Sequence, residues 1–228
     1  MARGKSATAV LYGAKGFSVM ARITALQVQK KNKDRVSVYL DGRFAFGLPA
    51  IVAATLKLDQ ILSDDEIEAL KEQGAVEGAY NRALHYLSYR PRSRAEVIAY
   101  LQGRDVPEPQ IDEITARLER AGLLDDAEFA RYWVENREAF QPRGPQALRY
   151  ELRAKGLDDR IIHQALDSLD VSDSAYRAAA KKARQLVGSD KDLYRRKLIE
   201  YLARRGFDYE VARQAAERHW TEFEQQTL

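Results

Sequence analysis

Three segments of this chain repeat one another at steps of 51 and 50 residues. The seven residues that end at Leu101 align with those that end at Leu152 and Leu202, and all three segments are apolar at their third and seventh positions. An apolar residue also follows each leucine by five positions, namely Val106, Leu157 and Phe207. An internal period of this length is the signature of repeat architectures. The chain from residue 78 onward is therefore predicted to contain three tandem units.

Each unit is predicted to contain three helices. The stripe Ile162, Ala165, Leu166 and Leu169 has the spacing of a buried helical face. The helices are expected at 79–89, 93–102 and 108–121, then at 126–140, 145–155 and 159–169, and finally at 173–187, 193–205 and 209–223. Because a unit of about 50 residues buries its apolar stripes poorly, successive units should lean on one another in an elongated, curved array.

Capping signals agree with these helices. Ser93 and Glu96 have the spacing of a capping box, and Asp125 stands three residues before Glu128. Glycines that suit left-handed helix C-caps follow four of the predicted helices, at Gly122, Gly156, Gly188 and Gly206.

The N-terminal part has a different pattern, with short β-prone runs instead of helical repeats. Short β-prone runs at 23–29, 36–40 and 44–46 predict a small three-stranded meander. Ser63 and Glu66 should then open a short helix that ends near Gln73, and Gly74 to Gly78 should form a boundary. The predicted organisation is a flexible basic tail (1–22), the meander and helix (23–77) and three repeats (78–124, 125–171 and 172–228).

Composition excludes several kinds of chemistry. The chain has no Cys and three His, far apart in sequence, so disulfides, thiolate nucleophiles and zinc clusters are not expected. Its acidic clusters fall where helices begin, where carboxylates accept free N–H groups. No Walker loop or dinucleotide fingerprint is present. We expect a non-enzymatic protein without a cofactor or metal. The absence of a long apolar run or a signal sequence predicts a cytoplasmic protein that does not enter membranes. We also expect a monomer.

The net charge of +3 is unevenly distributed. Residues 1–35 hold eight Lys or Arg and one Asp, whereas the middle of the chain is acidic. A polyanion would therefore meet local basic patches rather than a uniformly positive surface. The patch at Lys30, Lys31, Lys33 and Arg35 can equally be a solvated hairpin tip, because lysine at a sheet edge discourages aggregation.

Seven cations are the candidate contact residues for an anionic partner. Arg90, Arg92 and Arg94 surround one proline-stiffened turn, and guanidinium groups bind phosphate and carboxylate in a bidentate manner. Cations also recur at the ends of the second and third middle helices. A cation at a helix C-terminus is ordinary, but recurrence would place these residues on a common edge of the array. They are Arg153 and Lys155, and Arg204 and Arg205.

Several aromatic residues lie on or near apolar stripes, and we interpret them as core residues rather than stacking platforms. They are Tyr86, Tyr100, Phe129, Tyr132, Trp133 and Trp220.

The chain resembles the RecX family of recombination regulators over roughly residues 79–223. The resemblance is carried by Leu87-Ser88-Tyr89-Arg90-Pro91-Arg92-Ser93, by Gly122-Leu123-Leu124-Asp125-Asp126, by Leu152-Arg153-Ala154-Lys155-Gly156-Leu157 and by Tyr201-Leu202-Ala203-Arg204-Arg205-Gly206-Phe207. It implies tandem three-helix repeats that lodge in the groove of RecA filaments on single-stranded DNA. It also implies inhibition of RecA's ATP hydrolysis, strand exchange and stimulated repressor cleavage, together with weak direct DNA binding.

Two other functions fit the same pattern less well. A helical DNA-binding protein or transcriptional repressor would use its repeats as helix-turn-helix modules, but no helix is rich in Arg, Asn and Gln on one exposed face. A structural scaffold for other proteins would need no basic edge.

Overall fold

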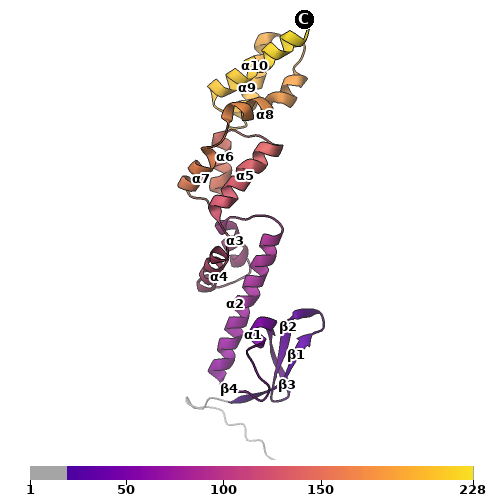
Figure 1. The fold of residues 1–228 in the computed structure, drawn as a ribbon, viewed down its shortest axis with the longest axis vertical. Helices are drawn as coiled ribbons and strands as arrows, with labels where there is room; N and C mark the ends of the chain where they lie inside the picture. The colour runs from indigo at the N-terminus through magenta and orange to yellow at the C-terminus, as the bar shows by residue number, and fades with distance from the viewer. Residues whose placement is uncertain (1–19, 228) are drawn as a thin grey trace, which may run out of the picture. The chain divides into compact units, whose positions relative to one another are not determined.

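The computed structural model describes residues 20–227 (Figure 1). The chain divides into two compact units, one up to Asn81 and one from Arg82 onward. Most of the tail predicted at residues 1–22 lies outside the described residues. Its last two residues, Ala21 and Arg22, already belong to the first strand, so the predicted tail is too long there.

The first unit contains an antiparallel sheet with the strand order β3-β2-β1-β4. The three predicted strands are confirmed and are longer than expected. The fourth strand and a one-turn helix were not predicted, because elements this short carry no hydrophobic period. The strands are β1 (Ala21–Gln29), β2 (Asn32–Leu40), β3 (Arg43–Pro49) and β4 (Ile61–Leu62), and the short helix is α1 (Ala50–Ala53).

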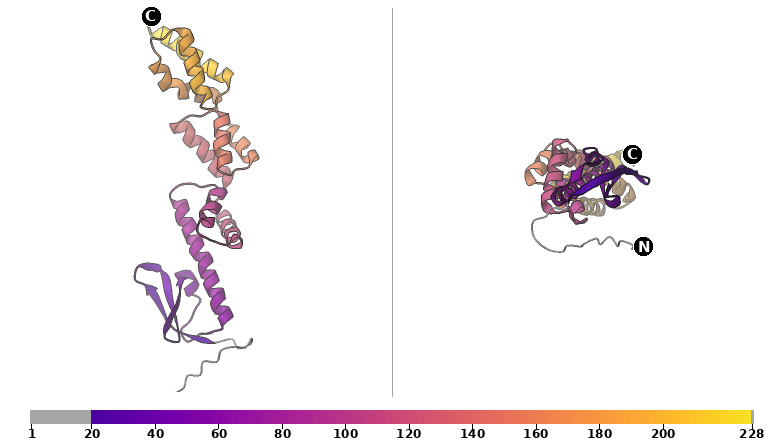
Figure 2. Two further views of the ribbon diagram at one scale, coloured as in Figure 1. Left: turned by 180° about the vertical axis from the view of Figure 1, so that it is seen from behind. Right: turned by 90° about the horizontal axis from the view of Figure 1, so that it is seen from below.

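One face of this sheet forms the core of the first unit. Ile23, Val38 and Leu48 are almost completely buried there, together with side chains from α1 and β4. The N-terminal part of α2 (Asp64–Ser88) packs against the same face, as the views from front and back show (Figures 1 and 2). The opposite face of the β1-β2-β3 meander has no such cluster.

Helix α2 corrects a predicted boundary. The sequence suggested a helix that ends near Gln73 and a new one from residue 79, but a single helix of 25 residues runs through both glycines and from one unit into the other. Glycine inside a helix costs only about 1 kcal/mol relative to alanine, which tertiary contacts can outweigh. At Gly74 an added Cβ would lie 2.6 Å from Leu48 Cδ2, so close packing on the sheet explains this glycine.

The remaining helices match the predicted repeats closely. They are α3 (Arg94–Gln102), α4 (Glu108–Arg120), α5 (Asp126–Phe140), α6 (Pro145–Ala154), α7 (Asp159–Leu166), α8 (Val171–Gln185), α9 (Lys191–Ala203) and α10 (Tyr209–Thr227). The capping box of Ser93 and Glu96 is present. All four predicted C-cap glycines have positive φ angles, between 66° and 91°.

The second and third repeats each have a hydrophobic core of their own. Phe129, Leu148 and Ile162 belong to one cluster, and Tyr194 and Leu198 belong to another. The expectation that units lean on one another to bury their apolar stripes is therefore wrong for these two repeats. Three short amphipathic helices can cover one another's stripes when each contributes a few large side chains.

A fragment that starts at Gly78 and contains all three repeats should remain helical, because the clusters of the second and third repeats lie wholly within it. Far-ultraviolet circular dichroism of this fragment should show the helix content of residues 79–227. A fragment without helical signal, beside a folded full chain, would mean that the sheet unit completes the repeat core.

Candidate functional site

The N-terminus of α3, the second helix of the first repeat, packs against the C-terminus of α6, the second helix of the second repeat. We call such an end-to-end contact between second helices a joint. Ser93, the N-cap of α3, is fully buried, and its hydroxyl donates a hydrogen bond of 2.7 Å to the carbonyl oxygen of Lys155 at the C-terminus of α6. The contact is close, since a Cβ added to Gly156 would lie 2.4 Å from the Cβ of Ala95. The backbone after α6 therefore has to be glycine.

The same joint occurs one repeat further on, between α6 and α9. The backbone N–H groups of Gly144 and Gln146 donate to the carbonyl oxygens of Arg205 (2.9 Å) and Gly206 (3.3 Å). A Cβ at Gly144 would lie 2.1 Å from the Gly206 oxygen. In both joints the free N–H end of one helix meets the free C=O end of another, which is the favourable orientation of two helix dipoles.

The first joint also contains a small ion network centred on Glu96. Arg90 donates two hydrogen bonds to its carboxylate, at 3.1 and 2.9 Å, and Lys155 Nζ donates a third at 2.7 Å from the neighbouring repeat. Burial alone raises the pKa of Glu96, but the hydrogen bonds from Arg90 and Lys155 outweigh it and lower the pKa to about 2. Lys155 thus joins the two repeats, and Arg90 completes the network from the repeat that contains Glu96.

Arg92 belongs to a stack of four flat groups. Its guanidinium lies 4.0 Å from the centre of the Tyr86 ring, which stacks on Tyr100 with 4.0 Å between ring centroids. The guanidinium of Arg104 covers the far side of Tyr100 at 3.7 Å. These contacts fix the turn before α3 on the body of the first repeat. Tyr86 and Tyr100 are half-buried in this stack rather than in the buried core, so their prediction as core residues is wrong.

The other four candidate cations have different surroundings. Arg94 pairs with Glu119 of α4, and Arg153 pairs with Asp159 of α7, both in exposed positions. The guanidinium of Arg205 lies over the ring of Tyr201 at 4.7 Å. Arg204 is exposed, and among residues 20–227 its side chain has no hydrogen-bond or ion-pair partner. The seven cations therefore differ in their partners, and a common edge formed by them stays a prediction.

A shallow groove of about 690 Å³ runs beside the Arg90 turn. Leu84, Leu87 and Phe129 line it, together with three exposed aromatic or aliphatic residues that were not candidates. These are Tyr89, Leu123 and Tyr132, with 69%, 49% and 36% of their surface exposed. Tyr132 was predicted as a core residue. It follows Phe129 by three positions, at the margin of the buried stripe of α5, and its ring therefore reaches the surface.

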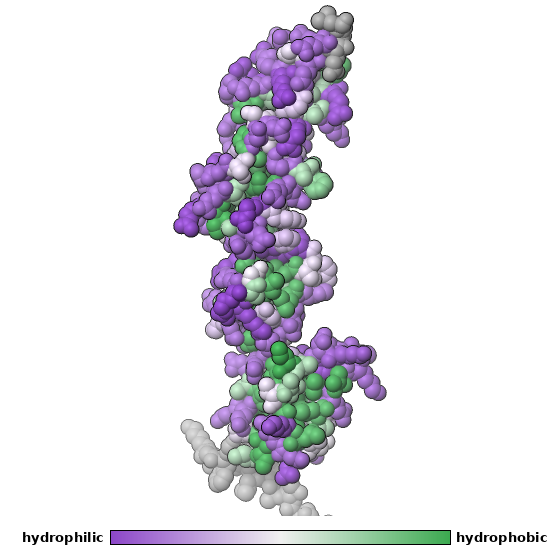
Figure 3. Space-filling model, in the orientation of Figure 1, coloured by the Kyte–Doolittle hydropathy of each residue, from purple (hydrophilic) through white to green (hydrophobic). Residues whose placement is uncertain are grey.

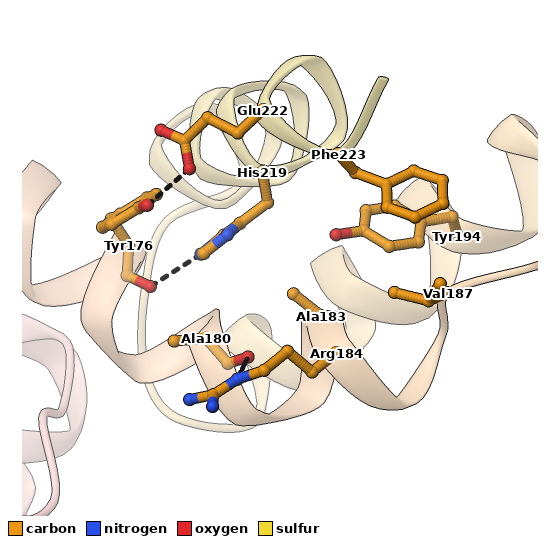
Figure 4. A pocket seen from close by; sticks show the side chains of 9 residues that line it. All are labelled: Tyr176, Ala180, Ala183, Arg184, Val187, Tyr194, His219, Glu222 and Phe223. Carbon is orange, nitrogen blue, oxygen red and sulfur yellow. Dashed lines mark hydrogen bonds between the residues drawn. The ribbon is translucent and has the colours of Figure 1, made fainter. Parts of the chain in front are cut away.

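The third repeat has a smaller pocket of about 280 Å³ between α8, α9 and α10 (Figure 4). The Tyr176 ring stacks on His219 at 4.1 Å, its hydroxyl donates to Glu222, and the backbone oxygen of Tyr176 lies 2.9 Å from His219 Nε2. These contacts join α8 to α10. Within residues 20–227, no group of three or more His, Asp or Glu side chains could hold a metal ion, and no helix is both long and apolar enough to cross a membrane.

Comparison with known proteins accounts for the repeats. Regions described as the first, second and third three-helix domains of RecX match residues 79–118, 125–166 and 170–216, and the RecX N-terminal domain matches residues 21–63. The chain belongs to the RecX family. The joints, the Glu96 network and the Arg90 turn are therefore features of a RecX protein.

RecX relatives cover most of this chain. Regulatory protein RecX of Bacillus subtilis is 37% identical over 84% of the chain and 75% of the relative, and that of Listeria innocua is 31% identical over 86% and 74%. A crystal structure of a regulatory protein RecX matches with a TM-score of 0.71 at 28% identity, over 86% of this chain and 99% of the other. RecX from Lactobacillus salivarius matches with a TM-score of 0.58 over 63% of this chain and 96% of the other.

Acid should weaken the first joint through Glu96. Its carboxylate binds a proton less readily in the folded than in the unfolded chain, so its contribution to stability is complete above pH about 4.5 and is lost as the pH falls toward about 2. Replacement Glu96→Gln should lower the free energy of unfolding by about 1–2 kcal/mol at pH 7 and by much less at pH 2. Urea titrations at both pH values test this. The control is Glu68→Gln, because Glu68 forms an exposed ion pair with Lys71.

Gly144→Ala should open the second joint. The φ angle of Gly144 is −71°, which alanine adopts freely, so any cost arises from the collision with Gly206 of the next repeat. We expect a loss of about 1–3 kcal/mol in unfolding free energy. Hydrogen exchange should also lose protection at the amides of residues 144 and 146. Gly103→Ala is the matched control. Gly103 has a φ of −65°, and a Cβ added there would have its nearest contact at 3.4 Å, so this change should alter neither the unfolding free energy nor the amide protection.

Proposed function

We propose that this RecX protein regulates the RecA recombinase by binding RecA filaments on single-stranded DNA. Binding would inhibit the recombinase, ATPase and coprotease activities of the filament and so modulate DNA repair and recombination. The proposal assigns no catalytic step to the chain, and direct DNA contact is a weaker, secondary interaction.

The observation that carries this proposal is the repeated joint. A joint of the same design connects α3 to α6 and α6 to α9, so equivalent surfaces recur along the chain with each repeat. A recurring surface suits a partner that itself repeats, because several modest contacts then add up through a high effective concentration. A filament of identical RecA subunits is such a partner.

The exposed candidate cations are the best placed to contact the filament. Arg153 keeps 60% of its side chain exposed despite its pairing with Asp159, and Arg204 is exposed without a partner among the described residues. Arg90 and Lys155 have a different role in this proposal, because their loss would leave Glu96 half-buried without cations.

Helix-turn-helix DNA binding through α3 or α6 is disfavoured. A recognition helix enters the major groove with its N-terminal residues against the bases. The N-terminus of α3 is covered by Lys155 and that of α6 by Arg205 and Gly206. Neither helix end is free for this role.

The proposal is tested by RecA's DNA-dependent ATP hydrolysis. Substoichiometric amounts of the full chain should reduce the hydrolysis rate, because a protein lodged on the filament opposes subunit motion or growth at the ends. The length of the filaments, measured by electron microscopy under the same conditions, should decrease or stop increasing. Unchanged hydrolysis and unchanged length at saturating protein would contradict the proposal.

The double variant Arg153→Ala, Arg204→Ala locates the contact. It should weaken cosedimentation with the filament by about tenfold without a change in Tm, since neither side chain is buried. The matched control is Arg160→Ala, Lys181→Ala, which removes two exposed cations elsewhere in the repeats. Equal loss in both variants would indicate nonspecific charge attraction instead of a contact at these positions.

A further inference from the structure

The outer face of the β1-β2-β3 meander forms a regular surface that neither α1 nor α2 covers. Lys71 of α2 lies over Phe46 on the inner face, and side chains alternate between the two faces along each strand. The pairing register therefore places two rows of three residues outside. These rows are Ala25, Tyr39 and Phe44, and Gln27, Ser37 and Gly47. Gln29 and Arg35 also lie on this face, since their side chains come close to the Gly47 position.

One end of this outer face is aromatic. Phe44 keeps 59% of its surface exposed, and its ring meets the Tyr39 ring edge to face with centroids 5.9 Å apart. Neither ring belongs to the hydrophobic cluster of this unit. Both rings therefore lie outside the core, and the exposed Phe44 ring is available to another flat group.

The middle of the face is flat and polar. Its side chains are small at Ala25 and Ser37, and Gly47 has none. Gln29 donates to Ser37 at 3.2 Å, and Arg35 donates to the carbonyl oxygen of Gly47 at 3.0 Å. A Cβ at Gly47 would lie 2.9 Å from the Gln29 amide nitrogen, so these polar groups lie close against the sheet and leave the surface above them open.

The other end is cationic. Lys30 and Lys31 form the hairpin turn, and Lys33 follows them at the start of β2. All three lysines are exposed, and none forms an ion pair within residues 20–227. Residues 20–49 contain six Lys or Arg against two Asp. Hydrophilic side chains gather on the projecting hairpin of this unit, next to apolar ones (Figure 3).

We propose that this outer face binds single-stranded DNA. From Lys33 to Tyr39 it extends six residues, or about 20 Å, with cations for phosphates at one end and aromatic rings for bases at the other. Stacking on Tyr39 and Phe44 needs bases whose faces are free, which a duplex does not offer. The inference deepens the proposed function, since it assigns the direct DNA contact to the N-terminal unit rather than to the repeats.

Binding of the full chain to fluorescein-labelled dT15 at low salt, without RecA, tests this face by anisotropy. Phe44→Ala should weaken binding about five- to tenfold. Phe140→Ala removes a phenylalanine that is 78% exposed in the second repeat and should have no effect. The triple variant Lys30→Glu, Lys31→Glu, Lys33→Glu should make the log–log salt slope shallower by about 2, because each phosphate contact contributes about 0.7.

The charge-matched control is Arg131→Glu, Arg160→Glu, Lys181→Glu in the repeats. If this control loses affinity and the hairpin variant does not, the repeats bind DNA and the inference is wrong. It is equally wrong if the wild-type chain does not bind dT15 at low salt, or binds a duplex of the same length more tightly. Because this assay contains no RecA, its outcome is separate from that of the ATPase experiment.

Discussion

The end-to-end contact between second helices is the constraint on which the helical unit depends. A helix end leaves backbone groups unpaired, and burying them without partners costs free energy. Here the buried N-terminus of one repeat's second helix uses the C-terminal carbonyls of the next repeat's second helix. The requirement to pair these groups fixes which ends meet, so the first and second repeats are each followed by a repeat in the same orientation.

The two joints meet this requirement with different chemistry. Ser93 and the Glu96 network make the first joint from side chains, whereas Gly144 and Gly206 make the second from backbone groups in close approach. Asp105, three residues before α4 begins, occupies the position equivalent to Gly156 and Gly206 with a φ of 56°. No second helix of another repeat stands on it. Glycine is thus required where a neighbour docks, and a short polar residue suffices where none does.

Local signals in the sequence were sufficient for most of the fold. The capping box at Ser93 and the C-cap glycines are set by backbone geometry within a few residues, so they could be predicted. The predicted helix boundary at Gly74 to Gly78 was wrong, because packing of Gly74 against Leu48 outweighs the low helix propensity of glycine. Glu96 could be recognised as a capping residue, but its bond to Lys155 joins residues 59 positions apart. No local pattern reveals a partner at that distance.

The arginine-rich turn shows why density of charge is an ambiguous guide to a binding site. Arg90, Arg92 and Arg94 lie within five residues, yet they take three different partners: a carboxylate of the joint, the ring of Tyr86 and Glu119 of α4. A guanidinium suits such partly buried sites because it is planar and weakly hydrated. The same properties that would favour phosphate recognition are used here to assemble the repeats. Cations that remain exposed without a structural partner, such as Arg204 and the hairpin lysines, therefore carry more information about external partners than the densest cluster does.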